Sequence, residues 1–138
     1  MAEIKLSDSA LSRYGEPSTM GLLTSGGLDS AILLYQILSH GWRVRPFYVR
    51  TGCLWQAEEI DAVGKLLAEL RQPNLEALVE LDMPVDDLYA EHWSMTGRSV
   101  PDQHSTDDAV FLPGRNPLLL LKPALWCTMH GVSKLALA

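Results

Sequence analysis

The feature that most constrains the fold is a short apolar run over residues 20–24 that stops at Ser25-Gly26-Gly27. After that turn, apolar residues recur at the spacing of one helical face, so the pattern predicts a strand, a tight turn and a helix in succession. We expect His40-Gly41 to end this helix. A strand followed so closely by a helix begins a βαβ unit, in which the next strand runs parallel to the first. The helical positions are Leu28, Ala31, Ile32, Tyr35 and Leu38.

The alternation of strands and helices continues along the chain. Residues 44–49 are rich in β-forming residues, although Pro46 favours a bulge or an edge position there. Residues 60–70 carry one apolar face and predict an amphipathic helix, and residues 78–82 predict a third strand. Residues 132–138 predict a fourth strand, which we expect to pair beside the first.

A long polar stretch, residues 84–112, separates the third strand from the last helix. So long a loop in a compact domain is usually functional, and we expect a short helix within it over residues 86–92. The last helix is expected to begin with Asn116 as N-cap and Pro117 at its first position. Pro123 removes a backbone donor within that helix, which predicts a kink or a break.

These elements predict an α/β fold with a doubly wound parallel sheet in three α/β/α layers, because parallel strands need right-handed crossover helices. The chain has 138 residues, the size of one domain, and we expect a leader segment over 1–18 and one domain over 19–138. In such sheets ligands bind at the carboxyl ends of the strands, where the strand order reverses. The turn after the first strand is therefore the expected site.

Charge and cysteine content exclude several classes of protein. Asp and Glu number 17 against 11 Lys and Arg, for a net charge of −6, whereas a binder of nucleic acid or anionic membranes would carry a basic excess. No apolar stretch is long enough for a signal peptide or a membrane helix. Two cysteines cannot form a disulfide framework or a four-cysteine zinc site. We expect a cytoplasmic protein with a small-molecule substrate and neither a nucleic-acid nor a membrane partner.

Chemistry is concentrated in Ser25-Gly26-Gly27-Leu28-Asp29-Ser30, called here the 25–30 turn. Two glycines let the backbone approach an anion, and the following helix offers free N–H groups. The two serines can donate hydrogen bonds, and Asp29 can hold a magnesium ion. The turn therefore predicts a pyrophosphate site. The alternative, a plain tight turn with Ser25 as a helix cap, leaves the acid and the second serine unexplained. The spacing is neither G-x-G-x-x-G nor a Walker motif.

This hexapeptide resembles the PP-loop of the N-type ATP pyrophosphatases. The resemblance implies a Rossmann-like fold of the adenine nucleotide alpha hydrolase type that binds ATP and Mg²⁺. Such enzymes split ATP between the α and β phosphates, pass the adenylyl group to a substrate oxygen, and let nitrogen or sulfur displace AMP. The residues expected to bind the nucleotide are Ser25, Gly26, Gly27, Leu28, Asp29 and Ser30, together with Tyr48 and Arg115.

A second stretch, Val110-Phe111-Leu112-Pro113-Gly114-Arg115-Asn116, narrows the resemblance. It is similar to the aromatic-x-Pro-Gly-Arg-Asn segment of the 7-cyano-7-deazaguanine synthase family, also called the queuosine-biosynthesis ExsB family. The loop residues 94–96 and 100–102 resemble that family too. The resemblance implies an ATP-dependent C–N ligase that converts 7-carboxy-7-deazaguanine and ammonia to 7-cyano-7-deazaguanine (preQ0) through an adenylated intermediate.

The expected catalytic residues are Asp29, Ser30 and Arg115. A guanidinium at a helix start does not suit the helix dipole, so Arg115 is expected to share a bound anion with the free N–H groups; the alternative is a salt bridge to Asp107 or Asp108. Tyr48 and Arg50, at the end of the second strand, are expected to touch the adenosine or the substrate. His104, with Asp107 and Asp108, is a weaker candidate for base and metal ligands.

The chain departs from the family pattern in two places. Residues 48–53 replace an aromatic-Asp-Tyr-Gly-Gln stretch, and the cysteine cluster that binds zinc in the family is absent. Cys127-x-x-His130 offers only two ligands and Cys53 is remote, so we expect no zinc in this chain. We expect the domain to be incomplete at its C-terminal end and its exposed strand edge to favour a homo-oligomer. Two alternatives are another PP-loop enzyme, which amidates a different carboxylate or thiolates tRNA, and a non-catalytic ATP-binding module.

Overall fold

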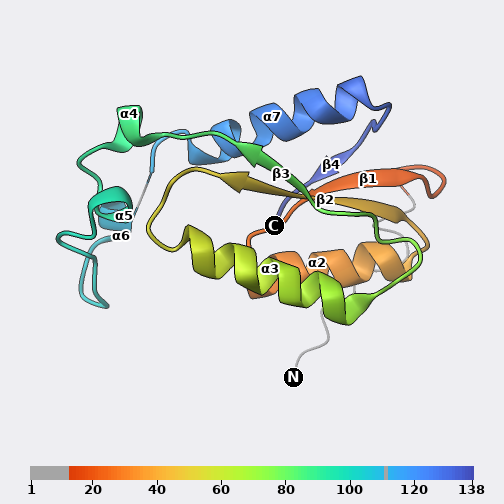
Figure 1. Ribbon diagram of the computed structural model, residues 1–138, viewed down its shortest axis with the longest axis horizontal. Coiled ribbons are helices and arrows are strands. Elements are labelled where there is room, and N and C mark those ends of the chain that lie inside the picture. Colours follow the sequence, from red (N-terminus) through yellow and green to blue (C-terminus); the bar gives the residue numbers. More distant parts are fainter. Residues whose placement is uncertain (1–12, 111) are drawn as a thin grey trace.

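The computed structural model, which describes residues 13–110 and 112–138, is built around a four-stranded parallel sheet (Figure 1). The strands lie in the order β3-β2-β1-β4, and every adjacent pair is parallel. The chain is an α/β protein with a doubly wound sheet, as the alternating pattern predicts. The strands are β1 (Thr19–Leu23), β2 (Arg43–Arg50), β3 (Val79–Asp82) and β4 (Leu135–Ala136).

Helices cover both faces of the sheet. The helices α2 (Leu28–Ser39) and α3 (Gln56–Leu70) lie on one face, and α7 (Arg115–Met129) lies on the other (Figure 1). The chain passes from β1 outward to β2 and β3, and then returns through α7 to place β4 on the other side of β1. The strand order therefore reverses at β1, and its carboxyl end is where such a fold leaves room for a ligand.

The core forms where the central strands meet α2. Leu22 and Val44 of the strands and Leu34 and Ile37 of the helix are fully buried. Burying each such side chain is worth about 1.5–3 kcal/mol relative to exposure. On the opposite face, a Cβ added at Gly21 would lie 2.9 Å from the Sγ of Cys127, so α7 packs directly against the backbone of β1.

Pro46 lies in the interior of the sheet, because β2 is paired on both sides, and its predicted edge position is wrong. The other option, a bulge, is confirmed in the neighbouring segment. Val44 lies opposite Leu75 and Phe47 opposite Val79, so two residues of β2 face three residues of the next segment. Pairing is interrupted where Pro46 has no N–H to donate, which makes the proline tolerable there.

The start of α7 differs from the prediction. Asn116 is not the N-cap: the helix begins at Arg115, after Gly114 adopts a left-handed φ of 73°. Pro117 lies in the first turn instead of at the first position, where its missing N–H is still not needed. The helix continues through Pro123 without a break. The sequence rule fails here because a left-handed glycine ends the preceding turn and sets the helix start itself.

The segment between β3 and α7 is mostly irregular, as predicted. In place of one helix over 86–92, it contains α4 (Asp86–Tyr89) and α5 (Trp93–Thr96), and later α6 (Asp107–Val110). At the other end, β4 pairs beside β1 as predicted, but only Leu135 and Ala136 take part. Phe111 and most of the predicted leader over 1–18 lie outside the described residues.

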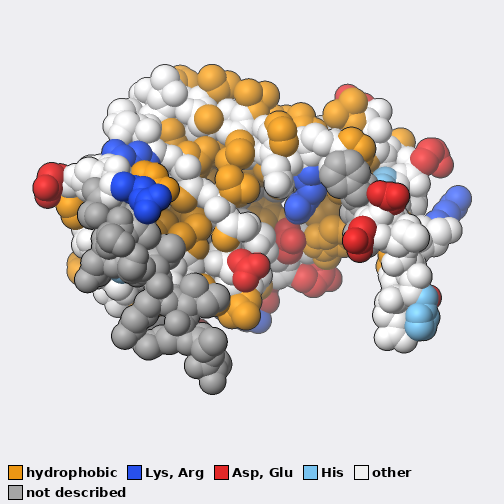
Figure 2. Space-filling model, turned by 180° about the vertical axis from the view of Figure 1, so that it is seen from behind, with side chains coloured by type: hydrophobic (Ala, Val, Ile, Leu, Met, Phe, Trp, Pro, Cys, Tyr) orange, Lys and Arg blue, Asp and Glu red, His pale blue; other side chains and the backbone are white. Residues whose placement is uncertain are grey.

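The outward face of α7 is apolar. Leu121, Leu125 and Met129 follow one another at intervals of four residues and are exposed by 53%, 56% and 81%. Seen from behind, hydrophobic side chains gather along the part of the molecule formed by this helix (Figure 2). Within the described ranges, no helix is long and apolar enough to span a bilayer.

Candidate functional site

The 25–30 turn joins β1 to α2 at the carboxyl edge of the sheet, where the strand order reverses. Thr24 fixes the entry to the turn, since its backbone N–H and its hydroxyl both donate to the carbonyl oxygen of Phe47, at 2.8 Å and 2.7 Å. Ser25, Gly27, Leu28 and Asp29 are exposed beyond this anchor. The structure therefore exposes four of the six residues of this turn to solvent.

Ser30 is the exception, because its side chain is buried. Its hydroxyl donates to the carbonyl oxygen of Gly27 at 3.1 Å and accepts from the N–H of Ser25 at 3.4 Å. The hydroxyl thus closes the turn from inside. Direct contact of Ser30 with a ligand remains a prediction, and its observed contacts are those of a residue that shapes the turn.

Ser25 does not cap helix α2, so the alternative of a plain turn with a serine cap is wrong. The N-cap of α2 is Gly27, which has no side chain to offer, and the hydroxyl of Ser25 accepts from the N–H of Gly27 at 3.3 Å. The first N–H groups of α2 and the positive end of its dipole are left for an external anion. Asp29 lies in this first turn.

Gly26 is the position in the turn at which glycine is required. It has a left-handed φ of 76°, and a Cβ added to it would lie 3.0 Å from the Cβ of Ala62 and 3.1 Å from the carbonyl oxygen of Glu59. The turn therefore rests against the first half of α3. Gly27 differs, because its φ of −82° is accessible to any residue.

Tyr48 links β2 to the same part of α3. Its side chain is buried, and its hydroxyl donates to the Oε2 of Glu59 at 2.7 Å. Burial raises the pKa of Tyr48, and the neighbouring carboxylate of Glu59 raises it further. Contact of Tyr48 with adenosine remains a prediction, but the partner of its hydroxyl in this structure is Glu59. The sequence does not identify Glu59 as this partner, because nothing local to residue 59 marks it as one.

Arg115 begins α7 and its side chain is exposed. It lies near enough to Tyr48 and Cys53 for its charge to lower the pKa of both, against the larger effect of burial, which raises them. Within the described residues Arg115 makes no ion pair, so the alternative salt bridge to Asp107 or Asp108 does not form. The structure thus places the guanidinium of Arg115, which has no ion pair among the described residues, near Thr51 and Cys53 just after the end of β2.

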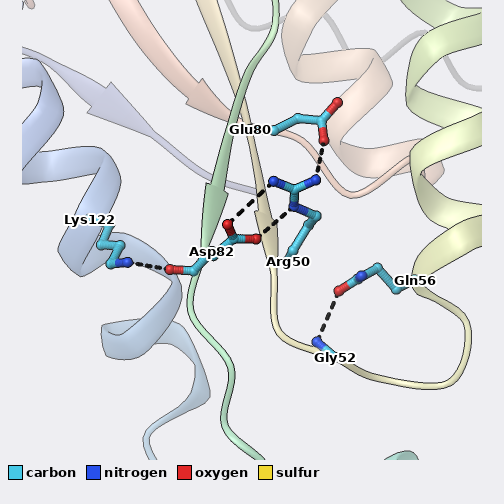
Figure 3. A network of polar contacts seen from close by, with 6 residues as sticks. All are labelled: Arg50, Gly52, Gln56, Glu80, Asp82 and Lys122. Atoms are coloured by element: carbon cyan, nitrogen blue, oxygen red, sulfur yellow. Dashed lines mark hydrogen bonds and ion pairs between the residues drawn. The ribbon is translucent and has the colours of Figure 1, made fainter.

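Arg50 is engaged with the edge strand (Figure 3). Its Nε and one terminal nitrogen donate to the carboxylate of Asp82 at 2.8 Å and 3.4 Å, and the other terminal nitrogen lies 3.2 Å from Glu80. Lys122 of α7 donates to the carbonyl oxygen of Asp82. The guanidinium of Arg50 therefore joins β2 to β3, and its contact with a substrate remains a prediction without support from these partners.

The other polar candidates are not gathered into a site. His104, Asp107 and Asp108 are exposed, and among the described residues no three His, Cys, Asp or Glu side chains could hold a metal ion. Cys127 is buried, and the ring of His130 stacks on Trp126 with 3.7 Å between centroids. This pair takes part in packing and not in a shared site.

Comparisons with known proteins match the part of the chain that contains these candidate residues. A family model described as "Queuosine biosynthesis protein QueC" matches residues 20–138, which include the 25–30 turn and Arg115. The chain is also similar to "7-cyano-7-deazaguanine synthase 1" of Desulfitobacterium hafniense (strain Y51), with 29% identity over 119 residues. The aligned region covers 84% of this chain and 53% of that relative, so the chain spans about half the length of the curated relative it matches.

Proposed function

The chain belongs to the queuosine biosynthesis protein QueC family, and from this premise we propose that it performs ATP-dependent ligation of ammonia to 7-carboxy-7-deazaguanine, giving 7-cyano-7-deazaguanine. The observation that carries the proposal is the open 25–30 turn at the strand-order reversal, with the free guanidinium of Arg115 at the neighbouring strand end. The similarity to a relative named as 7-cyano-7-deazaguanine synthase supports the choice of acceptor.

The reaction requires a carboxylate oxygen to become a leaving group. Attack of that oxygen on the α-phosphorus of ATP gives an acyl adenylate and releases pyrophosphate. Ammonia then displaces AMP to form an amide and loses a proton. The amide oxygen then attacks the α-phosphorus of a second ATP and again releases pyrophosphate, and loss of AMP together with the two N–H protons leaves the nitrile. Two molecules of ATP are therefore consumed for each nitrile formed.

The residues of the site suit this chemistry by position and charge. The N–H groups of the first turn of α2 would bind the departing pyrophosphate, because a helix N-terminus favours an anion. Arg115 would neutralise charge on the α-phosphoryl group from the facing side, and such fixed charges supply most of the catalysis in phosphoryl transfer. No side chain needs to form a covalent bond.

A magnesium ion fits the turn through Asp29. This carboxylate is exposed in the first turn of α2, and Mg²⁺ at nucleotide sites commonly takes one or two protein carboxylates together with phosphate oxygens and water. When bound, the ion would neutralise charge on the leaving pyrophosphate. Asp29 would hold and orient the ion, and Ser25 would donate to a phosphate oxygen.

The test is release of AMP by the purified protein supplied with ATP, Mg²⁺, ammonia and 7-carboxy-7-deazaguanine. Release should require both ammonia and the deazapurine acid. Asp29→Asn and Ser25→Ala should each lower turnover by about tenfold or more, since a lost charge-assisted contact is worth about 1.5–3 kcal/mol. Asp86→Asn, at an exposed position in the first turn of α4, is the matched control. Tight ATP binding without AMP release would refute the proposal and favour a binding module.

A further inference from the structure

The 25–30 turn is supported from two sides, and the two supports are bonded to each other. On one side, Thr24 donates twice to the carbonyl oxygen of Phe47 in β2. On the other side, Gly26 lies against the carbonyl oxygen of Glu59 in α3. Tyr48, the residue after Phe47, donates to the side chain of that same Glu59. The turn, the end of β2 and the start of α3 therefore form a closed ring of contacts.

The half of α3 that supports the turn is not the half that packs on the main core. The residues of this helix that pack there are Leu66, Leu67 and Leu70, all in its second half. Val63 is the one fully buried residue of α3, every residue of which the structure describes. The N-cap residue of this helix, Trp55, makes no capping hydrogen bond with its side chain. Individual hydrogen bonds therefore have a large influence on where residues 56–62 lie.

Gln56 and Glu59 each tie the start of α3 to the chain that precedes it. Gln56 accepts from the backbone N–H of Gly52 at 2.9 Å, but this bond spans four residues and fixes only the loop before the helix (Figure 3). The bond from Tyr48 to Glu59 spans eleven residues and joins the sheet to the helix turn on which Gly26 lies. Because Tyr48 is buried and its acceptor is charged, water competes little for this bond.

The position of Gly26 affects the N–H groups that would bind an anion. Gly26 precedes Gly27, the N-cap of α2, so its conformation sets the direction in which the first N–H groups of that helix point. A glycine has many conformations open to it, and contact with α3 selects one of them. A displacement of about 1 Å in a site of this kind can cost about 100-fold in rate. A movement of Glu59 would therefore reach the proposed phosphate site through the backbone.

Resting on the part of the proposed function that puts the phosphates of ATP at the 25–30 turn, we propose that Glu59 is a positioning residue of this site. It acts through the hydrogen bond that it accepts from Tyr48. This bond holds the first half of α3 against Gly26 and so keeps the N–H groups at the start of α2 aligned. What the site needs from Glu59 is an acceptor oxygen, because a negative charge beside the phosphates would by itself weaken their binding.

Magnesium pyrophosphate distinguishes this role from a contact of Tyr48 with adenosine, because it contains no adenosine. Titration calorimetry gives the Kd of Mg·pyrophosphate and of Mg·ATP, at a temperature at which circular dichroism shows each variant to be folded. Tyr48→Phe should weaken both by the same factor, about fivefold or more, as expected for one lost hydrogen bond. Weaker binding of ATP alone would assign Tyr48 to the adenosine and overturn the proposal. A lower thermal midpoint with unchanged Kd values would also overturn it.

Variants of Glu59 test whether the acceptor oxygen is what matters. Glu59→Ala should weaken both ligands as much as Tyr48→Phe, and the double variant should bind no more weakly than either. Glu59→Gln keeps an acceptor for the Tyr48 hydroxyl and should bind within about twofold of the wild type. Glu58→Ala is the matched control, because it removes an exposed carboxylate from the same first turn of α3. Additive losses, or equal losses in Glu58→Ala and Glu59→Ala, would overturn the proposal.

Release of AMP separates this role from the proposed function. The expected pattern of Kd values without any AMP release would keep the positioning role and refute the proposed function. AMP release with a wild-type KM for ATP in Tyr48→Phe and Glu59→Ala would do the reverse. If the wild type binds neither Mg·ATP nor Mg·pyrophosphate, both are refuted. If Glu59→Ala does not fold, Tyr48→Phe decides, because it removes one oxygen atom.

Discussion

Gly26→Ala should lower the free energy of unfolding more than a glycine-to-alanine change at another turn of the described chain where the added methyl group meets no other atom. At the left-handed φ of 76°, a non-glycine residue costs about 1–2 kcal/mol. The added Cβ would also lie 3.0 Å from the Cβ of Ala62 and 3.1 Å from the carbonyl oxygen of Glu59. Neither atom can rotate away, and overpacking of this kind costs about 1–3 kcal/mol. The total expected loss is about 2–5 kcal/mol.

The turn can avoid part of this loss by moving away from α3. In that case the free energy of unfolding falls less, but the N–H groups of α2 no longer lie where the phosphates need them. Stability and ATP binding must therefore be measured together, by urea unfolding and by titration calorimetry with Mg·ATP. Gly26→Ala should lower at least one of them strongly.

Gly41→Ala is the matched control for the conformational part. Gly41 has a φ of 82° with no atom within 4 Å of an added Cβ, so it should lose only about 1–2 kcal/mol and keep ATP binding. Gly27→Ala, at an extended φ, should change stability little. If Gly26→Ala costs no more than Gly41→Ala and binds ATP normally, the turn is not fitted against α3 and the reasoning is wrong.

Three further predictions concern β2. Tyr48→Phe should lower the free energy of unfolding by about 1.5–3 kcal/mol, because it removes a buried donor to the carboxylate of Glu59. Urea unfolding measures this loss, and Tyr35→Phe, at an exposed tyrosine, is the control. Equal losses in the two variants would contradict a stabilising hydrogen bond between Tyr48 and Glu59. Because burial and Glu59 raise the pKa of Tyr48, the unfolded chain loses this proton first as pH rises. The stability that the Tyr48 hydroxyl contributes is therefore complete below about pH 10 and is lost as the pH rises above it. Between about pH 8 and pH 11 the wild type should lose more stability than Tyr48→Phe. Parallel losses in the two proteins would refute a raised pKa of Tyr48 in the folded state. Arg50→Ala should cost less than about 1 kcal/mol, and the difference should shrink in high salt, since its ion pair with Asp82 is exposed; a larger loss that is independent of salt would show that the pair is not a surface contact.

The order of strands and helices was determined by the sequence alone. The period of the apolar residues changes from strand to helix at the 25–30 turn and again after each later loop, and these are local patterns that survive folding. Right-handed crossovers then leave few ways to arrange the strands, which is why the pairing of the first and fourth strands could be predicted. The turn that carries the candidate site could be predicted because its residues are continuous in the sequence.

Positions that depend on a neighbouring element were decided by the tertiary structure. The interior place of Pro46 is tolerated because the extra residue lies in the facing segment, outside the reach of any local pattern. The start of α7 is set by the left-handed φ of Gly114, which outweighs the capping preference of Asn116. In both cases the residue has the local preference that the sequence indicates, but the neighbouring segment or residue has the larger effect on the structure.

The same division applies within the site. The sequence predicted that residues 25–30 form a turn suited to an anion, because glycines, hydroxyls and a helix start act over a few adjacent residues. Only the tertiary structure decided that Gly26 rests on α3, that Tyr48 bonds to Glu59, and that Arg115 remains without an ion pair among the described residues. These residues are far apart along the chain and meet only because parallel strands bring their carboxyl ends to one edge of the sheet. The periodicity of apolar residues along the sequence does not indicate which side chains will meet at that edge. The contacts between them are therefore determined by tertiary packing.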